Sequence, residues 1–516
     1  MIMNLLAGPS GLAGVRQDRG VTERTDVQIV LPSHSDRVVA GLSEAIGGPL
    51  GRHASLRRRF WTPLQVILLL TSLVFAFNWV QKSPCRDGAW EDFSQYRNAC
   101  YTDVLALYYA EKLDQGYVPY VDHEVEYPVL TGVMMGVIGL PVHAVVSRGV
   151  LKNLGNPSEG TVFYDLTALA LAGFGLLTSY SIVRSRPRRP WDGAMVALAP
   201  AVFVTATVNW DYLAIGLTAL GLLAWSRRRP GWAGILLGLA TAAKFYPLLI
   251  LGPLILLCLR RRTYEARSAA LTTVLSSVFT WLVVNVPFAI MAPDGWSKFF
   301  RLSSSRAIDW GTFWYIGNHI PVGRDSAGKP DLGLPGFTWL SSHIPALNIM
   351  TWLTFTLCCV GIAALILFAP RRPRLGAMAF LVVATFLLTN KVWSQQFVLW
   401  LVPLAVLARP RWRAFLIWQA CELAYFFSFY QILLRVSGGK RLVLPEAAFT
   451  LASIARWVSV AVLCGLVVRE ALRPELDVVR QNGDDDPEGG VLDETPPVRT
   501  RSAELEEDPV AAVGSA

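Results

Sequence analysis

The sequence predicts an all-α polytopic membrane protein, and three observations support that fold class. Of the 516 residues, 53% are hydrophobic and only 16% are charged, whereas about 25% are charged in an ordinary soluble domain. Apolar runs of about 20 residues, long enough for a helix to cross a bilayer, recur between residues 61 and 472. Short arginine clusters separate these runs, as the positive-inside rule expects of cytosolic loops. A soluble enzyme is therefore excluded.

The composition also excludes several functions. Neither a disulfide scaffold nor a histidine pair at metal-ligand spacing is found, and the Walker and dinucleotide-binding fingerprints are absent. ATP-driven and nicotinamide chemistry are therefore not expected. The net charge is +9, but twelve acidic and only three basic residues follow residue 474, which leaves +18 on the rest. Because the arginines cluster at the ends of apolar runs, we interpret them as topology signals, with no nucleic-acid partner.

Both ends of the chain are predicted to be disordered cytosolic tails flanking a membrane domain of residues 57–472. Residues 1–56 show no apolar periodicity, and residues 473–516 are acidic and rich in Pro and Gly. The first span, residues 61–80, follows three arginines and has no small-residue cleavage site after it. It is therefore interpreted as an anchor whose N-terminal side lies in the cytosol.

The later arginine clusters divide the membrane domain into helical hairpins. The clusters predicted to be cytosolic are residues 184–189, 227–229, 260–262, 371–374 and 409–413, with Arg469 and Arg473. The hairpin tips then lie outside the cell, at residues 209–211, 246–247, 293–345, 390–396 and 435–445.

One segment does not fit this map. Residues 128–146 are long enough to span, but a single crossing there would place the cluster at 184–189 outside. Either the segment is re-entrant or two-part, interrupted at Pro141, or a further crossing is hidden near residues 151–160. We favour the re-entrant form and expect eleven to thirteen spans in total.

Residues 81–127 form a large first external loop of 47 residues, with nine acidic and four basic side chains. Loops of this size are usually functional or folded on their own. Cys85 and Cys100 are the only cysteines outside the apolar runs, and on the oxidising side of a membrane they are expected to form a disulfide. The spacing at 101–117 favours a helix lying on the membrane surface, with Asp103 in its first turn. That carboxylate could simply complement the helix dipole.

Three charges are predicted at the outer boundary of the spans: Asp211, Lys244 and Lys391. Charges at this depth usually line a cavity or pair with one another, although lysine can also snorkel to the interface. Opposite signs at one level favour a polar cavity. Further cations and aromatic side chains are expected on the same side, namely Arg301, Arg306, His319 and Trp310.

Such a cavity suits displacement at a sugar carbon with an anionic leaving group. A carboxylate would accept the proton of the attacking hydroxyl, and cations would stabilise the departing phosphate. Because nucleotide sugars are not available outside the cell, the donor would be a lipid-linked sugar phosphate.

Several motifs, taken in order, resemble glycosyltransferase family 87 of actinobacterial type. They are Asp103, Gly116, Pro119-Tyr120, Tyr127-Pro128, Asp211, the run from Ala233 to Pro247 that contains Lys244-Phe245-Tyr246-Pro247, and the run from Asn390 to Trp400. The resemblance covers about residues 60–430. It implies the GT-C fold, a helical body whose large first external loop carries a catalytic aspartate, and a polyprenyl-phosphate sugar donor, typically of mannose. One departure is Val129, where family members commonly have a second proline.

The resemblance also implies roles for individual residues. Asp103 would be the catalytic base of an inverting transfer, with Asp92 and Glu126 as reserves. The resemblance would place Lys244 near the donor phosphate, and Lys391 with Gln395 and Gln396 near the donor or the acceptor. The residues themselves, apart from the resemblance, add Arg301 and Arg306 as candidates to hold the phosphate, and they add Asp211, Tyr127, His319 and Trp310 as candidates to bind substrate.

The expected acceptor is a hydroxyl of a cell-envelope glycan, glycolipid or protein, and nothing in these residues distinguishes mannose from another sugar. No metal ligands are predicted, and a divalent cation as cofactor stays open. The alternative functions are a transporter or flippase of lipid-linked precursors, and a non-catalytic scaffold. Transporters usually show two related halves, and no internal repeat is found here.

Overall fold

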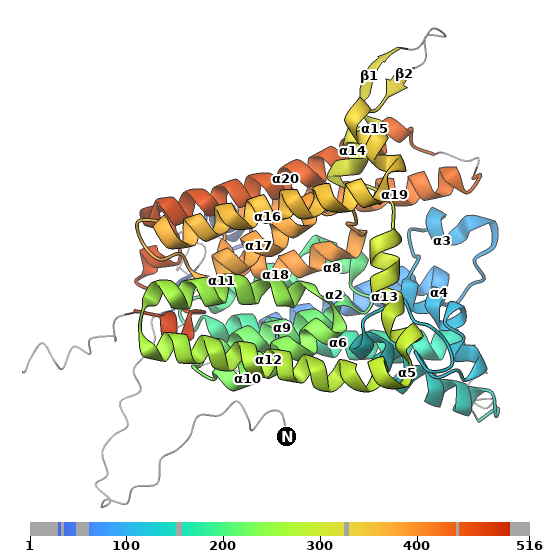
Figure 1. Ribbon diagram of the computed structural model, residues 1–516, viewed down its shortest axis with the longest axis horizontal. Helices are drawn as coiled ribbons and strands as arrows, with labels where there is room; N and C mark the ends of the chain where they lie inside the picture. Colours follow the sequence, from blue (N-terminus) through green and yellow to red (C-terminus); the bar gives the residue numbers. More distant parts are fainter. Residues whose placement is uncertain are drawn as a thin grey trace, which may run out of the picture.

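The computed structural model describes residues 29–31, 36–47, 61–150, 157–324, 330–439 and 443–495. These residues form a bundle of long helices that run side by side along the longest axis of the molecule (Figure 1). Among them, the only strands are β1 (Pro321–Arg324) and β2 (Pro330–Leu332), which pair as a small antiparallel hairpin. The predicted all-α polytopic fold class is confirmed.

Six helices are long and apolar enough to cross a membrane. They are α2 (Pro63–Arg86), α5 (Val129–Val146), α6 (Glu159–Ser185), α12 (Tyr264–Met291), α16 (Ile344–Phe368) and α20 (Glu446–Leu472). Beside them lie α9 (Asp211–Ser226), α10 (Pro230–Ala243), α11 (Tyr246–Arg261), α17 (Leu375–Thr389), α18 (Val398–Ala408) and α19 (Trp412–Val436). Almost every residue of α9, α17 and α18 is buried, so these shorter helices form the centre of the bundle. The total of eleven to thirteen crossings stays a prediction.

The bundle has two chemically different ends. One end, called the loop end, carries the short elements α3 (Ser94–Arg97), α4 (Asp103–Ala110), α13 (Pro293–Ser305), α14 (Phe313–His319), α15 (Pro335–Ser342), β1 and β2 (Figure 1). The other, called the arginine end, receives the last turns of α6 and α11, which contain Arg184, Arg260 and Arg261. The chain therefore alternates between the two ends, as the predicted hairpins require.

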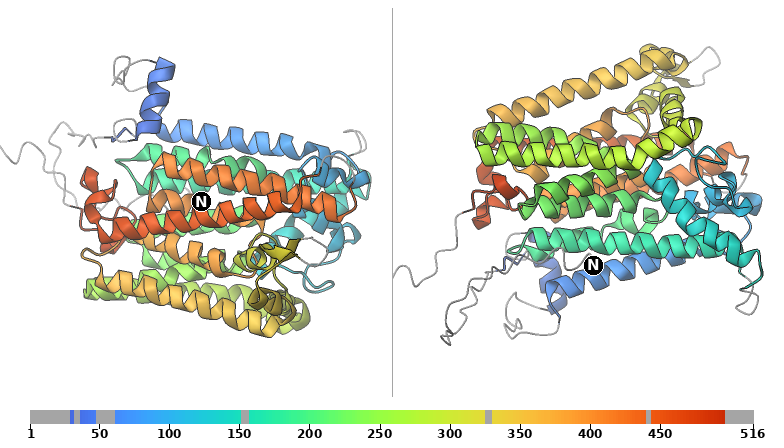
Figure 2. Two further views of the ribbon diagram at one scale, coloured as in Figure 1. Left: turned by 90° about the horizontal axis from the view of Figure 1, so that it is seen from above. Right: turned by 60° about the horizontal axis from the view of Figure 1, so that its bottom comes forward.

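Helix α5 stays at the loop end. It is continuous through Pro141, so the predicted interruption at that residue is wrong. In its first turn the Thr131 hydroxyl donates to the carbonyl of Ala243, at the loop end of α10, 2.8 Å away. In its last turn His143 Nδ1 lies 3.1 Å from Glu159 Oε2, at the start of α6. Both ends of α5 therefore contact the same end of the bundle (Figures 1 and 2), and the choice between a re-entrant segment and a further crossing stays a prediction.

Close packing of α10 against α12 fixes the position of Lys244, which directly follows α10. A Cβ atom on Gly238 would lie 2.5 Å from the carbonyl oxygen of Ser277 in α12, and one on Gly234 would collide with the carbonyl of Thr273. Small residues let helix backbones approach in membranes in this way. The chain then turns at Lys244-Phe245 and enters α11 with Pro247 in its first turn, where proline is favoured.

The C-terminal segment differs from expectation. Residues 474–495 were predicted to be part of a disordered tail, but they pack against the arginine end through the short 3-10 helices η8 (Pro474–Leu476), η9 (Arg480–Asn482) and η10 (Gly490–Leu492) (Figures 1 and 2). Their carboxylates neutralise buried arginines: Glu488 pairs with Arg186, and Asp477 lies 2.7 Å from Arg374. Composition alone missed this because the compensating charges come from distant helices. Residues 496–516 lie outside the described part.

The N-terminal region contains one described helix, α1 (Arg37–Gly47), within the tail that was predicted to be disordered. It is preceded by Asp36, whose carboxylate accepts from the backbone amide of Trp412. The remaining short helices are α7 (Gly193–Ala197) and α8 (Pro200–Thr205), which lead from the arginine end towards the candidate site. The rest of the predicted N-terminal tail lies almost entirely outside the described residues.

Candidate active site

The first loop, residues 81–127, is tied to the end of α2 by a disulfide between Cys85 and Cys100, as predicted. Three residues later the chain enters α4. Thr102 is the N-cap residue of α4, and its hydroxyl also donates to the carbonyl of Thr207, 2.7 Å away. The backbone amide of Asp103 donates to the carbonyl of Val208 at 2.8 Å. These bonds place Asp103 against the segment that leads into α9.

The surface helix predicted over residues 101–117 is shorter in the structure. Helix α4 ends at Ala110, and Lys112 and Gly116 adopt positive φ angles on either side of η4 (Leu113–Gln115). A left-handed residue stops an α-helix, so the chain turns here instead of continuing along the surface. One face of α4 is buried in the loop end, so this helix is part of the packed body.

Asp103 is held by neutral polar groups. Its Oδ2 atom lies 3.0 Å from Asn209 Nδ2 and 3.4 Å from the Tyr127 hydroxyl, and those two groups are 2.6 Å apart. Burial raises the pKa of Asp103 to about 6, while a hydrogen bond from Tyr101 opposes that shift. A carboxylate with this pKa can accept a proton efficiently near neutral pH. A carboxylate that only complemented the helix dipole would not need to be buried in this way, so the dipole alone does not account for Asp103.

Lys244 and Asp211 complete the same cluster. Lys244 Nζ lies 3.5 Å from Asp211 Oδ1, at the first residue of α9, and 4.8 Å from the centre of the Tyr127 ring. Asp211 also accepts from Trp400 Nε1 at 2.6 Å and is fully buried. The structure therefore brings Asp103, Tyr127, Asn209, Asp211 and Lys244 together, and we call these five residues the Asp103–Lys244 cluster. Lys244 does not snorkel away from the bundle.

The other predicted phosphate ligands lie on or near α13. Lys391 Nζ donates to the carbonyls of Arg306, at 2.6 Å, and Ser304, at 3.2 Å, so it anchors the chain that follows α13. Arg306 lies 3.9 Å from Glu126 and keeps 43% of its side chain exposed. Arg301 is half-exposed and pairs with Glu124 at 3.1 Å.

The remaining predicted residues divide between two places. Gln395 Nε2 donates to the Tyr430 hydroxyl, which donates to the carbonyl of Tyr101 beside Asp103. Gln396 is buried next to Gln395. His319 and Trp310 instead pack around Tyr315 and Phe449 in a separate aromatic group, and His319 Nε2 lies 3.7 Å from Glu446.

The two reserve carboxylates are placed differently. Asp92 keeps 81% of its side chain exposed and pairs with Arg97 at 2.9 Å, apart from the Asp103–Lys244 cluster. Glu126 acts electrostatically on Asp103 and raises the pKa of that carboxyl. Of the two, only Glu126 belongs to the surroundings of Asp103.

Sequence reasoning missed Asn209 of the cluster and three further polar residues around it. Lys82 on α2 is fully buried, with Nζ 3.3 Å from the carbonyl of Tyr101. Tyr101 itself bonds Asp103. Arg456 on α20 pairs with Glu422 at 3.0 Å and donates to the carbonyls of Trp393 and Ser394, which fixes the segment before Gln395. The sequence pattern places Lys82 in the loop because it follows the predicted span of residues 61–80. In the structure α2 continues to Arg86, so Lys82 lies one turn before its end. The only signal in the sequence was a lysine directly after an apolar run.

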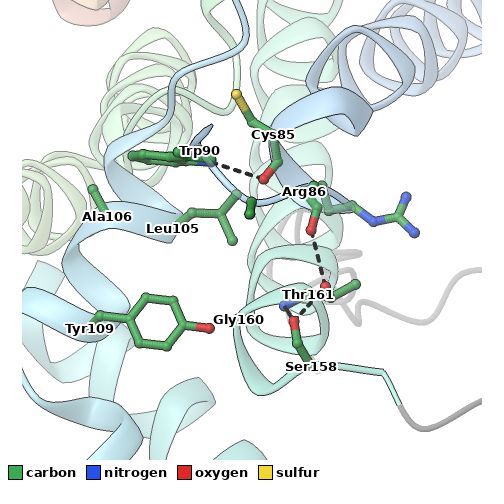
Figure 3. Close-up of a pocket in the computed structure, with 11 residues that line it drawn as sticks. Cys85, Arg86, Trp90, Leu105, Ala106, Tyr109, Ser158, Gly160 and Thr161 are labelled. Atoms are coloured by element: carbon green, nitrogen blue, oxygen red, sulfur yellow. Dashed lines mark hydrogen bonds between the residues drawn. The ribbon is translucent and has the colours of Figure 1, made fainter. Parts of the chain in front are cut away.

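A pocket of about 460 Å³ lies between the end of α2, helix α4 and the start of α6 (Figure 3), and no residue of the Asp103–Lys244 cluster lines it. Trp90 and Tyr109 contribute aromatic surface to its wall, and Ser158 and Thr161 contribute hydroxyls. Of the predicted site residues only Cys85 lines it. Within the described ranges, no three His, Cys, Asp or Glu side chains come together as a metal site.

A helical membrane body with a buried carboxylate beside cations at one end defines a polytopic membrane protein with an enzyme-like site. Residues 141–390 match the model of glycosyltransferase family 87, which confirms the family resemblance and shows a membrane glycosyltransferase. The matched region contains Asp211 and Lys244 but begins after Asp103 and ends before Lys391. No curated protein matches the chain.

Proposed function

We propose that this glycosyltransferase transfers a sugar, with mannose as the first candidate, from a polyprenyl-phosphate donor to a hydroxyl of a cell-envelope glycan, glycolipid or protein. The observation that carries the proposal is the Asp103–Lys244 cluster, in which a carboxylate with a pKa of about 6 shares Tyr127 with a buried ammonium group. A base and a phosphate ligand are thereby supplied from α4 and from the end of α10.

Asp103 acts as the general base in this mechanism. Its carboxylate accepts the proton of the acceptor hydroxyl while the hydroxyl oxygen forms a bond to the anomeric carbon. The bond from that carbon to the phosphate oxygen breaks, and its electron pair leaves with polyprenyl phosphate. Attack from the face opposite the phosphate inverts the anomeric configuration. Asn209 and Tyr127 keep the carboxylate oriented through Oδ2.

Lys244 holds the donor phosphate, and Arg306 assists it. The Lys244–Asp211 separation of 3.5 Å is long for a charge-assisted hydrogen bond, so the ammonium can donate to a phosphate that enters the cluster. Arg306 is partly exposed and only loosely paired, at 3.9 Å from Glu126. Lys391 contributes by fixing the backbone of Arg306. In this arrangement Arg301, which pairs with Glu124 beside Lys298, lies at the entrance through which the donor phosphate reaches the cluster.

The loop end is proposed to face the outside of the cell, with the arginine end and both tails in the cytosol. This orientation follows from the positive-inside rule applied to the arginine clusters. It also places a lipid-linked donor, which has been flipped across the membrane, at the same end as Asp103.

The test is transfer of radiolabel by the purified full-length protein from polyprenyl-phosphate sugars to envelope acceptors. Asp103→Asn should reduce turnover by about 100- to 10,000-fold while donor binding stays nearly intact, because only the basicity is lost. Lys244→Gln should weaken donor binding as well as turnover, since the phosphate is charged before and after transfer. The matched control is Asp92→Asn, in the same loop but exposed, which should keep normal activity.

Near-normal transfer by Asp103→Asn would place the base elsewhere, with Glu126 the next residue to test. If the wild-type protein binds no lipid-linked sugar and transfers no label, the proposed donor is wrong.

A further inference from the structure

Lys82 is a buried charge that the proposed mechanism does not use. It lies one turn before the end of α2, and its side chain is completely buried. Nζ donates to the carbonyl of Tyr101 at 3.3 Å and lies 5.6 Å from the centre of the Phe426 ring on α19. Burying an ammonium group is costly unless an opposite charge compensates for it. The carboxylate that acts electrostatically on Lys82 is Asp103.

The local chain geometry joins Lys82 and Asp103 into one unit. Lys82 and Cys85 are three residues apart and so lie on one face of α2. The disulfide from Cys85 to Cys100 holds the loop against that face, which presents the next residue, Tyr101, to the ammonium group. The backbone carbonyl of Tyr101 accepts from Lys82, and its phenol bonds Asp103.

Tyr101 is itself held in place from several sides. Its carbonyl also accepts from the Tyr430 hydroxyl at 3.3 Å, and its ring packs 5.3 Å from Trp90 and 6.1 Å from Tyr96. The contact between Lys82 and the Asp103 region is therefore a packed feature of the loop end.

We infer that Lys82 is a positioning residue that keeps the buried Asp103 carboxylate ionised, so that it can serve as the base; this rests on the proposed function. Lys244 supplies a second positive charge from the end of α10, and Glu126 opposes both. The titratable and charged groups around Asp103 are thus Lys82 on α2, Lys244 after α10, Asp211 at the start of α9, Tyr430 on α19, and Tyr101, Glu126 and Tyr127 in the first loop.

The test compares Lys82→Met with Lys82→Arg and with Lys112→Met, which removes a lysine from the same loop end away from Asp103. Label transfer is measured from pH 5 to 9. An opposite charge near a carboxylate lowers its pKa by about 1 unit or more, so Lys82→Met should move the acid limb of the profile upward by about 1 unit. Activity should fall about fivefold at pH 6 and about tenfold at pH 5, and it should approach the wild-type rate at pH 8.5. Lys82→Arg and Lys112→Met should keep the wild-type profile.

A second readout does not depend on transfer. A hydrophobic carbodiimide reacts with protonated buried carboxyls, so labelling of Asp103, located by mass spectrometry, reports its protonation at each pH. The labelling midpoint should rise with Lys82→Met. If that variant does not fold, Lys82→Gln, which can still donate to the Tyr101 carbonyl, replaces it under the same criterion.

The inference is overturned if neither the acid limb nor the labelling midpoint moves, or if activity falls by the same factor at every pH, which indicates a structural role only. If Asp103→Asn loses activity but Lys82→Met changes neither the acid limb nor the labelling midpoint, this inference is overturned and the proposed function is not. A shifted labelling midpoint in a protein that transfers no label supports the inference and overturns the proposed function.

Discussion

At the scale of single residues, the chemistry of the site is set by charges on elements far apart in the sequence. Asp103 comes from the first loop, Glu126 from the end of that loop and Lys244 from the end of α10. Burial and Glu126 raise the pKa of Asp103, and Lys244 lowers it. The proton affinity of the proposed base is therefore a property of the assembled cluster.

The wild-type enzyme should lose transfer activity as the pH falls below about 6. A base is active only when deprotonated, so below its pKa each further pH unit should reduce the rate about tenfold. Glu126→Gln removes a negative charge near Asp103, which makes the ionised carboxylate easier to form, so the acid limb should move to lower pH. The pH dependence of label transfer measures both effects. Complete loss of activity at every pH in Glu126→Gln would instead identify Glu126 as the base.

At the scale of secondary-structure elements, the position of Lys244 depends on how closely α10 approaches α12. Gly234 and Gly238 are four residues apart on α10, and the carbonyls of Thr273 and Ser277 on α12 fill the space that a Cβ atom would need. In contrast, a Cβ atom on Gly252 of α11 would meet nothing within 4 Å. The two positions give a direct comparison of the same substitution in a tight and an open environment.

Gly238→Ala should therefore destabilise the protein by about 1–3 kcal/mol, because overpacking forces the two helix backbones apart. Gly252→Ala should be neutral or slightly stabilising, because alanine favours a helix more than glycine does. Thermal unfolding of the two variants in detergent provides the measurement. Equal melting temperatures of the two variants would show that the close α10–α12 contact does not limit the stability of the protein.

At the scale of the whole molecule, the acidic C-terminal segment closes the arginine end. Arg374 is buried, and its carboxylate partners Asp477 and Glu488 both come from residues 474–495. Arg186, also buried, pairs with Glu488 of this segment and with Asp192 of the helical body. The same segment buries Leu492 and Val479, so apolar contact adds to the ion pairs. Removing one side of a buried pair leaves an uncompensated charge, which costs about 3–5 kcal/mol.

Truncation after Arg473 should consequently lower the melting temperature and the yield of folded protein, whereas truncation after Thr495 should have little effect. The two truncated proteins differ by a segment that packs against the body, so the comparison separates the effect of that segment from the effect of the rest of the tail. Thermal unfolding and size-exclusion chromatography of both proteins would decide. Unchanged stability after truncation at Arg473 would contradict the compensating role of the segment.

The sequence alone was sufficient for features that depend on one-dimensional pattern. Apolar run length gave the helical membrane fold, arginine spacing gave the alternation between two ends, and the isolation of Cys85 and Cys100 gave the disulfide. The motif order gave the family. Charges at span boundaries are rare and conspicuous, which placed Asp211 and Lys244 among the candidates, and the family resemblance added Asp103.

Only the tertiary structure decided which of these residues meet. It joined Asp103 to Asp211 and Lys244 through Tyr127 and Asn209, it placed His319 and Trp310 in a separate group, and it used Lys391 to hold a backbone segment. It also revealed Lys82 and the packed C-terminal segment. The physical reason is common to all of them: hydrophobicity and helix length are local properties of the chain, whereas the pairing of charges depends on distances between elements that are remote in sequence.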